Sequence, residues 1–176
     1  ALAPQAVSDN PLVETRSGAF DVPPFDRIEP EHFQPAFARA FAEHEAEVAA
    51  IAANAAEPTF ANTIEALELG GEALTRTASV FYLLAGAHTN DAIQEVERKL
   101  APLEARHWNR ILMDEALFRR IDALHRRRHQ LDLIAEQGRV LDRYHVKLRR
   151  AGAALAPAAK ARLAEINERL ATLGTA

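Results

Sequence analysis

The chain has 176 residues, with 21 basic and 25 acidic side chains, a formal net charge of −4 and no cysteine. A general nucleic-acid or membrane-surface role would need a basic excess, so we expect neither nucleic acid nor a membrane as a partner. The lack of cysteine excludes disulfides, thiol catalysis and cysteine-bound zinc, and no run of about 18 apolar residues is present that would predict a membrane span.

Residues 1–30 are expected to form an extended arm. Proline removes a backbone donor and restricts the residue before it, and this segment contains Pro4, Pro11, Pro23, Pro24 and Pro30. The arm has too many apolar side chains for a free tail, so we expect it to pack on the helices: Phe20, Val22, Phe25 and Ile28. Ala1-Leu2-Ala3 resembles the end of a secretory cleavage site, which leaves open whether the protein is periplasmic or cytoplasmic.

Residues 31–54 are predicted to form the first long helix. Pro35 falls in the first turn, where proline is tolerated, and Pro58 closes the segment. Nonpolar side chains and one histidine recur every three or four residues, which places them on one helical face: Phe33, Phe37, Phe41, His44, Val48 and Ile51.

A second helix is predicted from Thr59, a good N-cap residue, to about residue 85. Steps of four and three alternate along it, as in a heptad seam: Phe60, Ile64, Leu67, Gly71, Leu74, Ala78, Phe81 and Ala85. Glycine in a helix interior costs about 1 kcal/mol relative to alanine. Because the seam stays in phase across Gly70-Gly71, we favour a close approach of a neighbouring helix there over a bend.

Two further helices follow. Thr89-Asn90-Asp91 is a turn and cap cluster, and Pro102 is expected to kink the third helix behind it. That helix should turn one set of side chains inward: Ile93, Val96, Leu100, Leu103, His107 and Ile111. Asp114 is expected to cap a shorter fourth helix that presents Leu117, Phe118, Ile121 and Leu124.

The last two helices are predicted over residues 132–153 and from Pro157 onward. Pro157 suits the first turn of a helix. One face of this last helix is apolar: Leu163, Ile166, Leu170 and Leu173. The stripe ends three residues before the end of the chain. Either Gly174 caps the helix there, or the helix is interrupted at the end of this sequence; both explanations fit equally well.

No strand-like alternation occurs, so the fold class is predicted to be all-α. About six helices joined by short connections should pack as antiparallel hairpins. We expect two parts, the extended arm of residues 1–30 and a helical domain of residues 31–176.

One segment approaches a zinc-peptidase motif without completing it. A zincin helix needs histidine at the first and fifth positions, so that two imidazoles one turn apart bind the metal while glutamate activates water. Here His44-Glu45 is followed by Val48 at the fifth position. Because His44 lies on the apolar stripe of its helix, we favour a hydrogen-bonded core histidine.

Other candidate sites have simpler explanations. His125 and His129 are four residues apart and formally able to clamp a metal, but Arg126, Arg127 and Arg128 oppose a cation. We therefore interpret both as surface histidines near a helix C-terminus, where cationic side chains suit the helix dipole. A phosphotransfer histidine is a distant alternative, with three candidates: His88, His107 and His145.

Neither the basic run nor the serines indicates a catalytic site. Acidic residues interleave with the arginines between Arg119 and Arg128, so we interpret the run as a solvated face with local ion pairs. The serines lack a nucleophile-elbow context: Ser8, Ser17 and Ser79. We therefore assign no catalytic, cofactor-binding or metal-binding residue.

Several runs resemble the N-terminal region of bacterial peptidyl-dipeptidases, which with oligopeptidase A belong to the thimet oligopeptidase family of zinc metallopeptidases. The most specific are Asn62-Thr63-Ile64-Glu65-Ala66-Leu67 after Pro58-Thr59-Phe60, and Gly86-Ala87-His88-Thr89-Asn90. Weaker matches cover Asn10-Pro11-Leu12, residues 25–30 and 161–173. Two residues depart from the family pattern: Asn62 replaces an acidic residue, and Ala156 replaces a common serine cap.

The resemblance implies a longer, almost wholly helical parent with two lobes around a deep channel. The family's zinc ligands lie in its C-terminal half, and its N-terminal helices form part of the channel wall and roof. We therefore expect zinc in the parent and none bound by this chain. The expected partners are the catalytic region of the same polypeptide and short peptide substrates.

These expectations lead to two hypotheses. The first is the N-terminal domain of a zinc metallopeptidase that releases C-terminal dipeptides, with the catalytic half absent from this chain and the chain alone inactive. The second is a stand-alone helical interaction module that holds a partner helix or peptide in a groove. The first expects coding sequence after Ala176 and the second a stop codon.

Overall fold

The computed structural model describes residues 10–14, 20 and 22–175. Within these residues the fold is all-α, without a strand, as predicted. Residues 1–9, 15–19, 21 and 176 lie outside the description, and with them Ala1-Leu2-Ala3, Pro4, Ser8 and Ser17. None of the described helices combines the length and the apolar character needed to cross a membrane.

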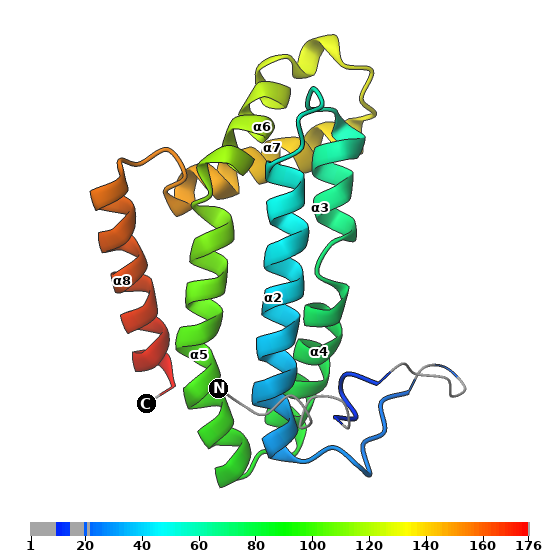
Figure 1. The fold of residues 1–176 in the computed structure, drawn as a ribbon, viewed down its shortest axis with the longest axis vertical. Coiled ribbons are helices and arrows are strands. Elements are labelled where there is room, and N and C mark those ends of the chain that lie inside the picture. Colours follow the sequence, from blue (N-terminus) through cyan, green and yellow to red (C-terminus); the bar gives the residue numbers. More distant parts are fainter. Residues whose placement is uncertain (1–9, 15–19, 21, 176) are drawn as a thin grey trace.

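The helix α2 (Phe33–Ala52) stands at the centre of the molecule, after a short 3-10 turn, η2 (Pro30–His32). In Figure 1 the chain rises along α2 and descends along α3 (Ala66–Leu69) and α4 (Glu72–Ala87), so this pair is antiparallel. The descent begins with a π-helical turn, η3 (Phe60–Glu65). Thr59 caps it, and Asn62 forms a capping box with Thr59. The cap is therefore retained although Asn62 replaces the acidic residue expected from the family pattern.

The predicted second helix is interrupted at the glycine pair, contrary to the expectation of a continuous helix. Gly70 is extended, with ψ 162°, and Gly71 adopts a left-handed conformation with φ 75°. The predicted close approach of a neighbouring helix does occur: a Cβ added to Gly71 would lie 3.2 Å from the His44 imidazole of α2. The Gly71 amide donates to Glu47 Oε2 at 2.7 Å, so a side chain of α2 caps the start of α4.

The next two helices begin at the predicted caps. Asn90 caps α5 (Asp91–Leu112), where its side chain accepts from the Ile93 amide, and α5 continues through Pro102. Asp114 caps α6 (Glu115–Arg126) by accepting from the Leu117 amide at 2.6 Å. These side chains satisfy amides that have no partner within their helices.

The last two helices pack on different neighbours. After a short turn, η4 (Arg128–Gln130), α7 (Ala135–Ala151) packs on α6, and Gly152 ends it with φ 101°. Pro157 opens α8 (Pro157–Gly174), which lies mainly against α5 at the edge of the molecule (Figure 1). Because α8 packs on α5 rather than on α7, the arrangement as hairpins of sequence neighbours is not confirmed.

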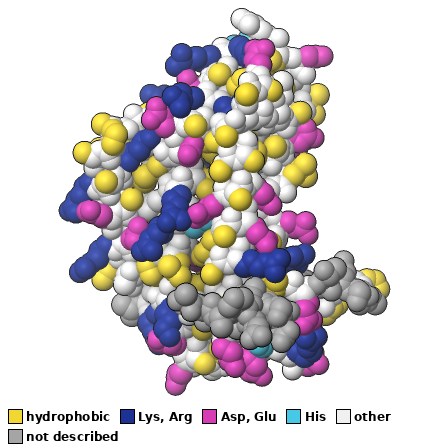
Figure 2. Space-filling view, viewed as in Figure 1, with side chains coloured by type: hydrophobic (Ala, Val, Ile, Leu, Met, Phe, Trp, Pro, Cys, Tyr) yellow, Lys and Arg dark blue, Asp and Glu magenta, His cyan; other side chains and the backbone are white. Residues whose placement is uncertain are grey.

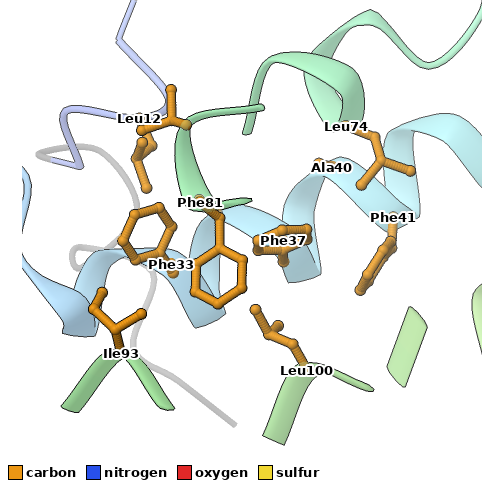
Figure 3. Packing of buried hydrophobic residues seen from close by; sticks show 11 residues of the cluster. Leu12, Phe33, Phe37, Ala40, Phe41, Leu74, Phe81, Ile93 and Leu100 are labelled. Atoms are coloured by element: carbon orange, nitrogen blue, oxygen red, sulfur yellow. The ribbon is translucent and has the colours of Figure 1, made fainter. Parts of the chain in front are cut away.

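The core consists of two apolar clusters, one at each end of α2. In the first cluster, the Phe81 ring meets Phe33 and Phe37 edge-on, with centroids 5.0 and 5.7 Å apart (Figure 3). The second cluster joins α2, η3, α5, α6 and α7 through Val48, Ile64, Ile111, Leu117, Ile121, Leu124, Leu141 and Leu148. Burying one such side chain contributes about 1.5–3 kcal/mol, so the two clusters fix α2 at both ends.

The N-terminal arm packs on the core, but only one of the four side chains predicted to make this contact does so. Leu12 is 3% exposed within the first cluster, and the Asn10 amide donates to the His32 carbonyl at 2.7 Å. Ile28 also packs there, as expected. The expectation for the other apolar side chains was wrong, because Phe20, Val22 and Phe25 are exposed.

Most of the apolar stripe of α8 is not buried by the contact with α5. That contact includes polar side chains: Asn167 donates to Asn109 at 2.7 Å, and Arg106 pairs with Glu168 at 3.0 Å. Three members of the stripe are exposed: Ile166, Leu170 and Leu173. Figure 2 shows apolar side chains over α8, with basic and acidic side chains beside them, and further apolar side chains over other parts of this face.

Replacing Gly71 by alanine is expected to lower the free energy of unfolding by about 1–3 kcal/mol, because the position is left-handed and faces the His44 ring. Gly138→Ala in α7 is the matched control. A Cβ there meets nothing within 4 Å, so alanine should stabilise the chain by about 0.5–1 kcal/mol. Urea denaturation of both variants measures the difference, and equal stability of the two would contradict the close approach.

Candidate functional site

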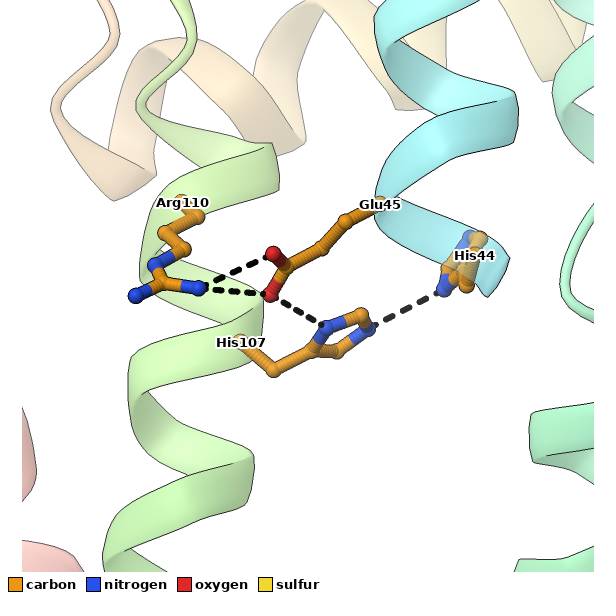
Figure 4. Close-up of polar contacts among 4 residues, drawn as sticks. All are labelled: His44, Glu45, His107 and Arg110. Atoms are coloured by element: carbon orange, nitrogen blue, oxygen red, sulfur yellow. Dashed lines mark hydrogen bonds and ion pairs between the residues drawn. The ribbon is translucent and has the colours of Figure 1, made fainter. Parts of the chain in front are cut away.

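A chain of four polar side chains lies at the junction between the two apolar clusters. His44 and Glu45 come from α2, and His107 and Arg110 from α5 (Figure 4). His44 Nδ1 lies 3.0 Å from His107 Nε2, and His107 Nδ1 lies 3.2 Å from Glu45 Oε1. The Arg110 guanidinium closes the chain at 2.9 Å from Glu45 Oε2. The two imidazoles are buried, and the Arg110 side chain reaches solvent.

Burial lowers the pKa of His44 and of His107, which outweighs the opposite pull of nearby glutamates and favours two neutral imidazoles. With neutral rings, one arrangement of protons satisfies both contacts: His107 donates from Nδ1 to the Glu45 carboxylate and accepts at Nε2 from His44 Nδ1. The fourth nitrogen, His44 Nε2, lies beside Gly71.

His44 also lines a cavity of about 260 Å³ between α2, α4, α5 and α7. Most of its wall is apolar, and polar groups are few. The Lys147 ammonium lies 5.4 Å from the centre of the Trp108 ring, and both side chains belong to this wall. The cavity therefore combines a mainly apolar wall with one ammonium group.

An open, shallow depression of about 910 Å³, here called the α7 groove, lies along the exposed side of α7 and shares Tyr144 and Lys147 with the cavity. Apart from Glu68 of α3, all of its lining residues belong to α7. Two acidic residues, Glu68 and Asp142, lie in its lining. Its basic side chains are Arg139, Arg143, Lys147 and Arg150. The Tyr144 hydroxyl donates to Glu68 at 2.5 Å and ties α7 to α3, and burial is the main cause that raises the pKa of Tyr144.

The incomplete zinc motif forms no metal site here. His44 is the hydrogen-bonded core histidine that the sequence favoured, with 8% of its surface exposed. Glu45 is occupied by His107 and Arg110, and Val48 is buried in the second cluster. Among the described residues, no three histidine, aspartate or glutamate side chains come together to hold a metal ion.

The structure separates His125 from His129. His125 lies in the last turn of α6 and stacks on His145 with centroids 3.8 Å apart, whereas His129 lies in η4. His145 Nε2 lies 3.1 Å from Asp122 Oδ1, and His125 Nε2 lies 3.2 Å from Asp142 Oδ1. His125 is thus near the helix C-terminus, as expected, but it packs between helices rather than standing in solvent.

The three histidines considered for phosphotransfer differ in exposure, and the Ser79 hydroxyl is bound within its own helix. His107 and His145 are buried, 2% and 8% exposed, so neither presents a free imidazole to a kinase. His88 is exposed at the end of α4. The Ser79 hydroxyl donates to the Thr75 carbonyl of its own helix at 2.7 Å, so no base activates it.

Two arginines of the basic run are structural, contrary to the prediction of a solvated face. Arg120 is 7% exposed and donates to the Asn54 and Ala56 carbonyls at 2.5 and 3.0 Å. Arg127 donates to the Pro58 carbonyl and pairs with Glu57. Position 120 lies on the same helical face as Leu117, Ile121 and Leu124, which is the sequence signal that marks it as buried.

We expect acidification to destabilise the chain through its buried histidines. Above the unfolded pKa of about 6.5 both states are neutral. As the pH falls below 6.5, the unfolded chain takes up protons that His44 and His107 resist in the folded state, because their pKa values are lowered. Stability should fall by about 1.4 kcal/mol for each unit of pKa lowering.

Imidazole NMR titration, assigned with His44→Asn and His107→Asn variants, measures the two midpoints. Urea denaturation between pH 7.5 and 5.5 measures the loss of stability in parallel. Midpoints at or above 6.5, together with stability that does not change over this range, would contradict the neutral histidine chain.

Comparison with known proteins reveals relatives over nearly the whole chain. It is 41% identical to the dipeptidyl carboxypeptidase of Escherichia coli over 164 residues, which are 93% of this chain and 24% of that protein. The Salmonella typhimurium dipeptidyl carboxypeptidase is 40% identical over 95% of the chain and 25% of its own length. Oligopeptidase A of S. typhimurium is 27% identical over 94% of the chain.

No family model matches the chain. The chain spans about a quarter of the length of the curated relatives that it matches. By sequence it therefore belongs among the relatives of bacterial dipeptidyl carboxypeptidases, with oligopeptidase A more distant, as the motifs indicated.

Proposed function

We propose that this chain is the N-terminal helical domain of a zinc metallopeptidase that releases dipeptides from the C-termini of short peptides. The observation that carries the proposal is the 40–41% identity to two dipeptidyl carboxypeptidases over 93–95% of the chain. Those proteins are about four times as long, so a large region beyond the matched segment is available for the reaction.

In this proposal the catalytic zinc lies in the remaining part of the polypeptide. The described residues do not fit a zinc site, because Val48 stands where a second histidine ligand is needed and Glu45 is held by Arg110. We therefore assign no step of peptide hydrolysis to this segment. Its role is mechanical, as part of the wall and roof of the substrate channel.

A wall element needs a rigid frame and a surface for the rest of the enzyme. Two apolar clusters hold α2 at both ends, which supplies the frame. The exposed side chains of α8, among them Ile166, Leu170 and Leu173, offer an apolar face. We propose that the catalytic region of the same polypeptide covers this face, because exposed apolar surface favours burial.

A stand-alone interaction module is the second candidate. The observation that favours it is the α7 groove, an exposed surface that carries four basic side chains. The two candidates differ in the size of the native protein. An antibody raised against this chain should detect a band several times larger than 19.4 kDa for a peptidase and a band at 19.4 kDa for a module.

The 176-residue chain alone is expected neither to bind zinc tightly nor to cleave short peptides, because it lacks the zincin ligand set and its Glu45 is held by Arg110. The native full-length protein should release dipeptides in a reaction that a chelator stops and added zinc restores. Mass spectrometry of the products and metal analysis of both proteins make the comparison. Chelator-sensitive cleavage by the purified 176-residue chain would overturn the proposal.

A further inference from the structure

Four basic side chains occupy one face of α7. Their spacing of four, four and three residues places them in a row, and all four are exposed: Arg139, Arg143, Lys147 and Arg150. None forms an ion pair with any residue in the part of the chain that the structure describes. Cations on adjacent turns repel one another, so this row attracts an anionic partner even though the whole chain carries a net charge of −4.

The acidic residues of the α7 groove do not neutralise this row. The lining holds four cations and two carboxylates, Glu68 and Asp142, so its formal charge is +2. Glu68 accepts a hydrogen bond from the Tyr144 hydroxyl and forms no ion pair with the row among the described residues. Asp142 pairs with His125 at 3.2 Å and lies 3.8 Å from Arg128, on the α6 side of the helix. The remaining excess of two positive charges is therefore available to a bound molecule.

The cavity beside the groove supplies an apolar subsite. It shares Tyr144 and Lys147 with the groove, and Leu74, Trp108 and Leu148 are among the apolar residues of its wall. The buried His44 ring forms part of this wall and contributes Nε2, which forms no hydrogen bond with the described residues. Its volume of about 260 Å³ lies below the range of roughly 300–1,000 Å³ for whole small ligands, so it suits one bulky side chain.

We propose that the α7 groove and this cavity together bind a separate acidic polypeptide segment that places one aromatic or large aliphatic side chain in the cavity. The cations supply charge complementarity and orientation, and the apolar anchor supplies the central buried contact. A polypeptide fits better than a single-stranded nucleic acid, which needs a series of aromatic stacking surfaces. Trp108 is the one tryptophan of the chain, and Lys147 lies over its ring. The proposal concerns binding and not cleavage, so it stands or falls separately from the peptidase assignment.

The test uses the 176-residue chain and a fluorescent twelve-residue peptide of aspartate and glutamate around one phenylalanine. Fluorescence anisotropy should show saturable binding that weakens as salt is added. Replacing the peptide phenylalanine by alanine should weaken binding about tenfold or more, because the anchor is lost. The Arg143→Glu/Lys147→Glu double variant should weaken it about tenfold as well.

The matched control is the Arg149→Glu/Arg169→Glu double variant. It makes the same charge change at two exposed arginines that line neither the groove nor the cavity. Its affinity should stay within about twofold of the wild type. Circular dichroism establishes that both double variants fold.

Several outcomes would overturn the proposal. They are equal weakening by the two double variants, no loss of affinity when the peptide phenylalanine is removed, and binding of a single-stranded oligonucleotide as tight as that of the peptide. Self-association of the chain through the groove would also overturn it, because the occupant would then be a second copy. Binding by the 176-residue chain but not by the native full-length protein would assign the groove to an internal segment instead.

Discussion

The contact of α2 with the break at Gly71 determines how the rest of the bundle is arranged. The His44 ring lies in the space left by the missing Cβ, and Glu47, three residues later, accepts the amide that opens α4. On its other side His44 bonds to His107 of α5. A buried polar group without a partner costs about 1–3 kcal/mol. A shift of α2 by one residue would leave several such groups unpaired, so these polar contacts specify a register that the apolar clusters alone would leave loose.

The far end of the bundle depends on a comparable device. The connection after α2 leaves backbone carbonyls that neither helix satisfies, and Arg120 of α6 donates to two of them from a buried position. Its guanidinium also reaches Asn62 and Thr63 of η3 at 2.9 and 3.3 Å. One planar cation with five donors can serve several acceptors at once, which a lysine ammonium cannot match. Charge at this position is therefore a structural requirement of the loop that it fills.

Local signals in the sequence predicted the helices well, because caps and periodicity act within one or two turns. Asn90, Asp114 and Pro157 begin helices where expected, and the apolar stripe of α2 is buried. The interruption at Gly71 was not predicted, because the apolar spacing continues across it and only the distant His44 and Glu47 make the break favourable. Of the candidate site, the burial of His44 was predictable from its stripe. Its pairing with His107, 63 positions away, depends on tertiary packing, as do the cavity and the α7 groove.

Two surfaces remain unsatisfied by the described residues, and they differ in chemistry. Several other surface cations have an acidic partner, as Arg39 has in Glu43 and Arg162 in Glu165. The row on α7 lacks such partners, whereas α8 exposes apolar side chains such as Leu170. Apolar faces suit permanent contacts, and charged grooves suit contacts that form quickly and respond to salt. Because α8 packs on α5 through polar side chains and α7 packs on α6, each surface can be covered without disturbing the other.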